Sequence, residues 1–244
     1  MNNVIVFLLE GFSDIQALEY PLSLFLDEIN EDVIPIFLCP PNDRGDITND
    51  PSVDQNEVIR RIPTWWDIDG QLRKKGLRMS DVVEIIQIID IDGVYLDDSK
   101  IIYSPVKKIQ YYEDKIVCPN RNRIIDRNLH KRHSISKLKS INSLTINTRC
   151  IPYSFYYFCC NIDHFTSGER NLVYKEKVLK ASTFAYSFGS GDEFLEFFLS
   201  EQNKCNAITN YKDSWELLKS NNNSLTYSSN LHLLLLKLKE KYHL

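Results

Sequence analysis

The sequence lacks the patterns that mark several large classes of protein. Its six cysteines form no CxxC pair and show no cysteine–histidine spacing typical of a structural zinc site. No apolar run reaches the roughly 18 to 20 residues that a membrane-spanning helix needs. The N-terminus has no basic segment and reaches Glu10 early, so no signal peptide is expected. These absences favour a cytoplasmic protein with reduced cysteines and no membrane partner.

The chain also lacks an excess of positive charge. Its 29 lysines and arginines are outnumbered by 33 acidic residues, which gives a formal net charge of −4 at pH 7. The overall charge therefore does not indicate nucleic-acid binding, although local patches matter more than the sum. The 244 residues, 43% of them hydrophobic, suffice for one large globular domain or two small ones.

The most informative stretch runs from Glu84 to Asp98 and joins an apolar run to a dense group of acids. Its isoleucines predict a buried strand that is bounded by Gly93. Asp90 and Asp92 come at the end of this run and point the same way, because strand side chains alternate between faces. Two neighbouring carboxylates at the end of a buried strand repel each other. A divalent cation would offset that repulsion.

The first 100 residues alternate between strand and helix patterns. Strands are predicted at 4–9, 33–38 and about 84–90, and a helix is predicted over 15–29. Between the second and third strands, a mostly helical, exposed segment over 53–78 is expected to begin after Asp50-Pro51. The alternation is typical of a parallel sheet with right-handed crossovers.

This topology brings distant acidic residues to one place. Glu10 follows the first strand, and Asp90 and Asp92 close the third. Parallel strands end at the same edge of their sheet, where ligands collect in such folds. We therefore expect all three carboxylates at one edge. Asp46, in the loop after the second strand, could lie near them.

The remainder combines strands, a basic segment and helices. Strands and turns are predicted over 101–118, a basic helix over 121–139, an aromatic strand over 153–160, and helices from 172 onwards. We predict one α/β fold with a parallel sheet flanked by helices. A sheet domain would cover residues 1–165, with a basic insertion at about 101–142, and a helical C-terminal region would cover 166–244.

The acidic motifs resemble those of a known domain family. The stretch Glu10-Gly11-Phe12-Ser13-Asp14 is similar to the EGxxD motif of the Toprim domain, and Asp90-Ile91-Asp92 is similar to its DxD motif. Toprim domains occur in topoisomerases, bacterial primases, small RNA-maturation nucleases and the OLD-type nucleases of phage defence. The resemblance covers about residues 1–100. No zinc ribbon or active-site tyrosine module accompanies it, which favours a small stand-alone nuclease of phage defence or of a mobile element.

The resemblance implies a Toprim-like parallel sheet and roles for individual residues. Glu10 would be the acid/base or a metal-linked carboxylate, and Asp14 would be a supporting acid of the metal site or only a helix cap. Asp90 and Asp92 would hold Mg²⁺ or Mn²⁺. The implied activity is metal-dependent cleavage of DNA or RNA, with a partner ATPase or a homo-oligomer left open. The long segments before and after the third strand depart from the family pattern.

A second candidate site is the basic stretch 121–139. It would contact the phosphate backbone of a nucleic acid independently of sequence. The candidate residues are Arg121, Arg123, Arg127, Lys131 and Arg132. A solvated helix face is an equal alternative, because charge runs commonly have that role. His164 could approach the acidic site if its strand joins the same sheet, and otherwise it is an ordinary turn residue.

Two other functions are kept open. Asp90-Ile91-Asp92-Gly93 also resembles the DxDG motif of haloacid-dehalogenase-type phosphatases, in which the first aspartate is a nucleophile and the second an acid/base. That family needs a later lysine and a second acidic motif, for which Gly191-Asp192-Glu193 is a faint candidate. It gives Glu10 no role. A non-catalytic nucleic-acid- or protein-binding module would depend on the basic stretch instead.

Overall fold

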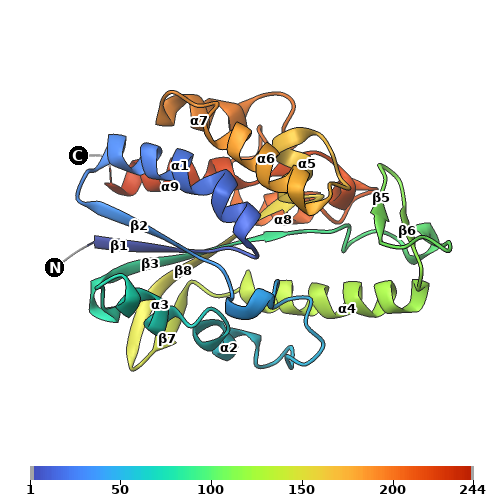
Figure 1. Cartoon of the computed structure of the whole chain (residues 1–244), viewed down its shortest axis with the longest axis horizontal. Coiled ribbons are helices and arrows are strands. Elements are labelled where there is room, and N and C mark those ends of the chain that lie inside the picture. The colour runs from blue at the N-terminus through green and yellow to red at the C-terminus, as the bar shows by residue number, and fades with distance from the viewer. Residues whose placement is uncertain (1–2, 243–244) are drawn as a thin grey trace.

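A mixed, mostly parallel sheet forms the centre of the computed structural model, which describes residues 3–242. The strands are β1 (Asn3–Leu8), β2 (Val33–Leu38), β3 (Val82–Asp90), β7 (Ser143–Ile146) and β8 (Arg149–Cys159), in the order β2-β1-β3-β8-β7 (Figure 1). The first four strands in space are parallel, whereas β7 runs antiparallel to β8. A short strand, β9 (Ser228–Ser229), pairs with the end of β8. The expected α/β class is confirmed.

Both faces of this sheet are buried, which explains why its strands are continuous apolar runs. In β1, Val4 and Val6 belong to one apolar core, whereas Ile5 and Phe7 belong to the other. The edge position of β2 explains how it tolerates Pro35, because an edge strand has fewer ladder hydrogen bonds to lose.

Helices cover the two faces of the sheet (Figure 1). One face carries α1 (Phe12–Ile29), α5 (Ile162–Ser167), α6 (Tyr174–Ala185), α7 (Gly191–Leu199) and α9 (Leu231–Tyr242). The other carries α2 (Val58–Trp65), α3 (Ile68–Lys74), α4 (Arg121–Leu138) and α8 (Tyr211–Leu217). The helices that follow residue 166 thus share their apolar cores with the N-terminal strands.

A second, smaller sheet lies beside the beginning of α4 (Figure 1). It consists of β4 (Ile101–Tyr103), β5 (Gln110–Tyr111) and β6 (Ile116–Cys118), in the order β4-β6-β5. Ile101 and Ile116 pack with Ile124 of α4 in an apolar cluster separate from the two large cores. This cluster fixes the position of the N-terminal half of α4.

The predicted helix start at Asp50-Pro51 is wrong. Residues 50–57 form turns, and α2 begins only at Val58. The side chains of Asp50 and Asp54 each accept a hydrogen bond from the amide two residues ahead, at 2.8 Å in both cases. These local bonds satisfy the backbone without a helix, which is why aspartate favours turns as readily as helix caps.

An ion-pair cluster anchors α9 to the centre of the sheet. Glu84 of β3 is completely buried, and its two carboxylate oxygens bind the ammonium groups of Lys237 and Lys241. Burial would raise the pKa of Glu84, but the two lysines outweigh it and hold the pKa below its ordinary value. A carboxylate of this kind stabilises the fold above its unfolded-state pKa, and this contribution is lost as pH falls through the folded-state value.

We expect Glu84→Gln to lower the free energy of unfolding by about 2 kcal/mol at neutral pH, because two charge-assisted hydrogen bonds are lost. The difference in unfolding free energy between wild type and variant should shrink as the pH falls through the range in which the wild-type Glu84 becomes protonated. Urea unfolding across this pH range measures both effects. Glu240→Gln, an exposed change on the same helix, should stay near wild type. A deficit independent of pH would contradict the ion-pair explanation.

Candidate functional site

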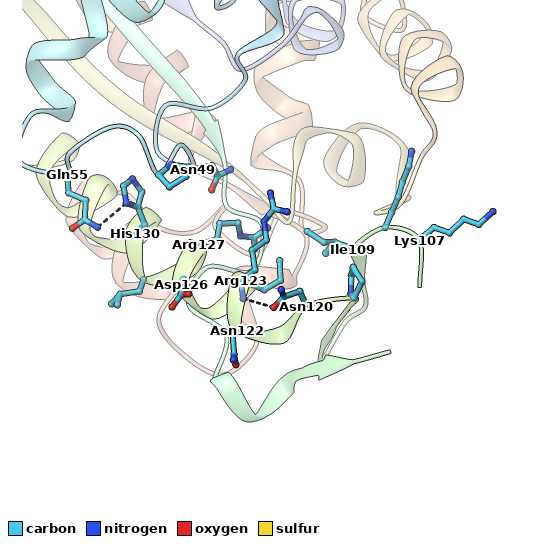
Figure 2. A pocket seen from close by; sticks show the side chains of 15 residues that line it. Asn49, Gln55, Lys107, Ile109, Asn120, Asn122, Arg123, Asp126, Arg127 and His130 are labelled. Atoms are coloured by element: carbon cyan, nitrogen blue, oxygen red, sulfur yellow. Dashed lines mark hydrogen bonds between the residues drawn. The ribbon is translucent and has the colours of Figure 1, made fainter. Parts of the chain in front are cut away.

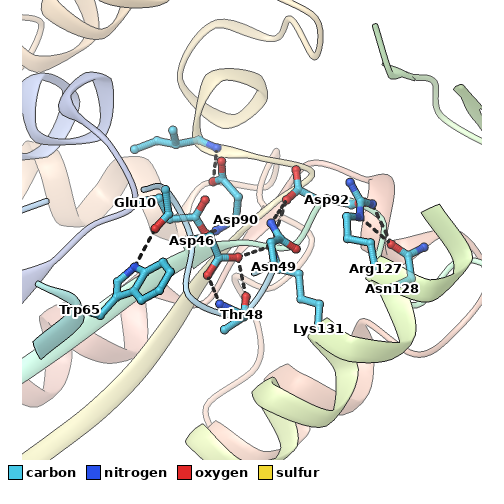
Figure 3. Close-up of polar contacts among 12 residues, drawn as sticks. Glu10, Asp46, Thr48, Asn49, Trp65, Asp90, Asp92, Arg127, Asn128 and Lys131 are labelled. Atoms are coloured by element: carbon cyan, nitrogen blue, oxygen red, sulfur yellow. Dashed lines mark hydrogen bonds and ion pairs between the residues drawn. The ribbon is translucent and has the colours of Figure 1, made fainter. Parts of the chain in front are cut away.

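Carboxylates from separate strands meet at the carboxyl-terminal edge of the main sheet (Figure 3). Glu10 follows β1, Asp90 is the last residue of β3, and Asp92 lies two residues further on. The Oε1 atom of Glu10 accepts a hydrogen bond from the backbone amide of Asp90 at 2.8 Å. The expectation that Glu10 and Asp90 share one edge is therefore confirmed. This contact joins positions 80 residues apart in the sequence.

The loop after β2 adds Asp46 to the group, as expected, and α4 adds Lys131. The ammonium of Lys131 lies 2.8 Å from Asp46 Oδ2 and 3.0 Å from Asp92 Oδ2. The Lys131 side chain has no exposed surface. It is thus an internal bridge between two carboxylates, and not the surface phosphate contact that the sequence predicted. Asn49, which sequence reasoning missed, also approaches Asp92, with Nδ2 3.5 Å from Oδ2.

The inward position of Lys131 has a signal in the sequence. The apolar residues Ile124, Ile135 and Leu138 of α4 recur at helical spacing, and Lys131 falls on the same face. Asn128, which is also buried, completes this face. A cation on the apolar side of a helix needs a partner inside the protein, because an unpaired buried charge is costly.

The backbone around both aspartates is held by several hydrogen bonds. Asp90 Oδ1 accepts a bond of 2.7 Å from the amide of Ile162, at the start of α5. Asp92 has a left-handed φ of 53°, its amide donates to Cys160 O at 2.7 Å, and Arg127 Nη2 donates to its carbonyl at 3.0 Å. The carboxylates are therefore fixed by contacts with β8, α5 and α4, and not by β3 alone.

A second pair of acids flanks Asp90 on the α1 and α5 side. Asp14 accepts a hydrogen bond from the Gly11 amide at 3.0 Å, so it is a cap of α1 as well as a neighbour of the site. Asp163 of α5 forms an ion pair with Lys177 of α6. Both Asp14 and Asp163 are buried. Their negative charges act on Asp90.

Burial and mutual repulsion disfavour the ionised forms of three of these acids. Burial, reinforced by the charge of Asp46, raises the pKa of Glu10 well above its usual range. Burial and the charge of Asp14 likewise raise the pKa of Asp90 well above its usual range. Burial and Asp163 raise the pKa of Asp14 to about 6. Burial opposes ionisation of Asp92 too, but Lys131 and Arg127 outweigh it and lower the Asp92 pKa to about 2.

The group holds more acids than cations. Six carboxyl groups, those of Glu10, Asp14, Asp46, Asp90, Asp92 and Asp163, surround three cations, those of Arg127, Lys131 and Lys177. Protons or an added cation must offset the difference. Within residues 3–242, no three histidine, cysteine or acidic side chains form a ready-made metal centre. Mg²⁺ is nevertheless commonly held by one or two carboxylates, with waters and substrate phosphates as its other ligands. Such an ion would take one or two of these carboxylates as its protein ligands.

The other candidate cations of α4 also have internal partners, with one exception. Arg121 donates to the carbonyls of Ile101 and Asp98 at 2.9 and 2.7 Å, and Arg132 donates to Val94 O at 3.4 Å. Among the described residues, only the side chain of Arg123 has no partner in this set of five. The basic helix therefore directs most of its charge towards the carbonyls and carboxylates of its own chain.

His164 does not join the acidic group. Its side chain is 4% exposed, and Nδ1 accepts a hydrogen bond from the Cys160 amide at 3.3 Å. The imidazole ring meets Tyr227 edge-on, with centroids 5.7 Å apart. The structure thus makes His164 a packing residue, and the expectation that it could approach the carboxylates is not met.

No family model, curated protein or solved structure matches the chain. The Toprim resemblance stays a prediction that rests on the two acidic motifs. Within residues 3–242, no helix is long and apolar enough to cross a lipid bilayer. The geometry and charge of the site are therefore the basis on which a function can be proposed.

Proposed function

We propose that this protein is a metal-dependent nuclease that cleaves phosphodiester bonds. The observation that supports this proposal most directly is the meeting of Glu10, Asp90 and Asp92, with Asp46, at the carboxyl edge of a parallel sheet. Dense carboxylates with too few cations are suited to Mg²⁺ or Mn²⁺. Phage defence or a mobile element is the biological setting that the Toprim-like motifs imply.

Each residue of the site has a distinct part in the proposed reaction. Asp90 and Asp92 would hold the ion, which would supply charge stabilisation at the phosphate and a more acidic water. Glu10 would ligate the ion or handle the proton. Lys131 bridges Asp46 and Asp92 and favours the ionised form of Asp92. The Oε2 atom of Glu10 has no hydrogen-bond partner among the described residues. A carboxyl with a raised pKa and a free oxygen is suited to take up and return a proton.

The phosphatase alternative fits the site less well. It needs a protonated acid at Asp92. Burial favours that form, but Lys131 and Arg127 outweigh burial and lower the pKa of Asp92. Its second acidic motif is engaged elsewhere, because Asp192 pairs with Lys239 and Glu193 accepts a bond from the Gly189 amide. The position of Glu10 beside Asp90 would also have no role.

A cleavage panel tests the proposal. We expect the purified protein to cut at least one member of a set of single- and double-stranded DNA and RNA when Mg²⁺ or Mn²⁺ is present. EDTA should abolish cutting, and excess Mg²⁺ should restore it. Asp90→Asn, which keeps the shape of the side chain, should be inactive with either ion. Cutting that persists in EDTA would contradict the proposal, and hydrolysis of phosphate monoesters alone would favour the phosphatase.

A further inference from the structure

A groove leads away from the carboxylate site. It has a volume of about 1090 Å³ and lies between the loop at 49–55, the segment 107–109 of the loop that joins β4 to β5, and residues 119–130 at the start of α4 (Figure 2). Two of its lining residues, Asn49 and Arg127, also contact Asp92. A ligand in this groove therefore lies next to the carboxylates.

The groove carries cations that have no internal partner. Lys107, Lys108 and Arg123 line it, are exposed, and have no side-chain hydrogen bond or ion pair within residues 3–242. They differ in this from Arg121, Arg127 and Lys131, whose side chains bind the protein itself. Asp126 is the only acid among the lining residues. The free charge of the groove is positive, which is complementary to a polyanion.

The wall of the groove is largely apolar. The apolar lining residues are Pro51, Ile109, Pro119, Ile124 and Leu129, and Leu129 is 48% exposed. Lys107 and Lys108 lie in the loop between β4 and β5. On either side of this loop, Tyr103 at the end of β4 and Tyr112 after β5 are exposed. A duplex keeps its bases inside and presents sugars and phosphates, so it gains little from apolar or aromatic walls. An unpaired strand can bury or stack its bases on them.

We propose that this groove binds single-stranded nucleic acid. The phosphates contact Lys107, Lys108 and Arg123, the bases pack against the apolar wall, and the strand reaches the carboxylates past Asn49 and Arg127. The assignment of the strand as a substrate rests on the proposed nuclease function. The assignment of the groove as a binding site for unpaired strands does not, because binding can be measured without cutting.

Fluorescence anisotropy in EDTA, with the Glu10→Gln protein and short labelled oligonucleotides, separates binding from cleavage. We expect single-stranded DNA or RNA to bind at least about tenfold more tightly than the matching duplex. The double variant Lys107→Glu/Lys108→Glu should weaken single-strand binding at least about tenfold and make its salt dependence shallower. Leu129→Ser should weaken it with little change in salt dependence, since only apolar contact is lost.

The matched control is Lys74→Glu/Lys75→Glu, which makes the same charge change at exposed positions of α3 and its C-cap. This control should bind single-stranded oligonucleotides as tightly as the Glu10→Gln protein without further changes. Equal losses in both double variants, or duplex binding as tight as single-strand binding, would overturn the inference. Metal-dependent cutting of duplex alone would overturn it and leave the nuclease proposal intact. Tight single-strand binding by a wild-type protein that cuts nothing would support the groove as a binding site and contradict the nuclease proposal.

Discussion

Glu10→Gln is expected to lower the rate of nucleic-acid cleavage about 100- to 10,000-fold, the range typical for loss of a general acid/base. The change removes the charge and proton affinity of the carboxyl group. It keeps an oxygen that can accept the 2.8 Å hydrogen bond from the Asp90 amide. Because burial and Asp46 disfavour the ionised form of Glu10, the variant should be at least as stable as wild type. Single-turnover cleavage and thermal unfolding measure the two effects separately.

The matched control is Glu19→Gln, an exposed change on α1, which should cleave at the wild-type rate. The comparison with Asp90→Asn separates the three candidate functions. A nuclease should lose activity in both Glu10→Gln and Asp90→Asn, whereas a phosphatase should lose it only in Asp90→Asn. A binding module should be indifferent to both changes. Wild-type cleavage by Glu10→Gln would therefore exclude the role proposed for this residue.

Lys131→Met is expected to lower the free energy of unfolding by about 3 to 5 kcal/mol, the cost of breaking a buried ion pair from one side. The ammonium is the cation closest to both Asp46 and Asp92, and its side chain has no exposed surface. Methionine fills a similar volume, so the loss is one of charge and not of packing. Without the lysine, the pKa of Asp92 should rise from about 2. The loss of stability in the variant should therefore shrink as the pH falls and Asp92 becomes protonated.

Two further variants make this prediction specific. Lys137→Met changes an exposed lysine of the same helix and should stay within about 0.5 kcal/mol of wild type. The double variant Lys131→Met/Asp46→Asn should recover part of the lost unfolding free energy, because it removes one of the two buried carboxylates that Lys131→Met leaves without a partner. Chemical denaturation across a pH series measures all three variants. A loss in Lys131→Met as small as that in Lys137→Met would contradict the bridging position of the ammonium.

Part of the candidate site could be predicted because it depends on strand ends. Glu10 and Asp90 follow apolar runs whose length and composition define β1 and β3, and parallel strands must end at the same edge. Asp46 could be placed near them by the same argument, since it follows β2. The side chains that come from α4 could not be placed in this way. Lys131 reaches Asp92 across 39 positions of sequence, and its partner depends on how the helix docks on the sheet.

The basic stretch 121–139 shows what charge patterns alone leave undecided. A run of arginines and lysines has the same sequence whether it faces water, a nucleic acid or the protein's own carboxylates. In the folded chain, Arg127 and Lys131 turn towards Asp92, whereas Arg123 stays exposed in the groove. The groove itself joins segments 49–55, 107–109 and 119–130, which no local pattern connects.

The α/β class, the order of the main strands and helices along the chain, and the shared edge of Glu10 and Asp90 could all be predicted from the amino-acid sequence. These follow from residue periodicity and from the direction of parallel strands, which are local properties. The position of Lys131 between Asp46 and Asp92, and the basic, partly apolar groove beside them, could be found only in the folded chain. Such features depend on long-range packing and on the desolvation of charge, which exist only once the chain is folded.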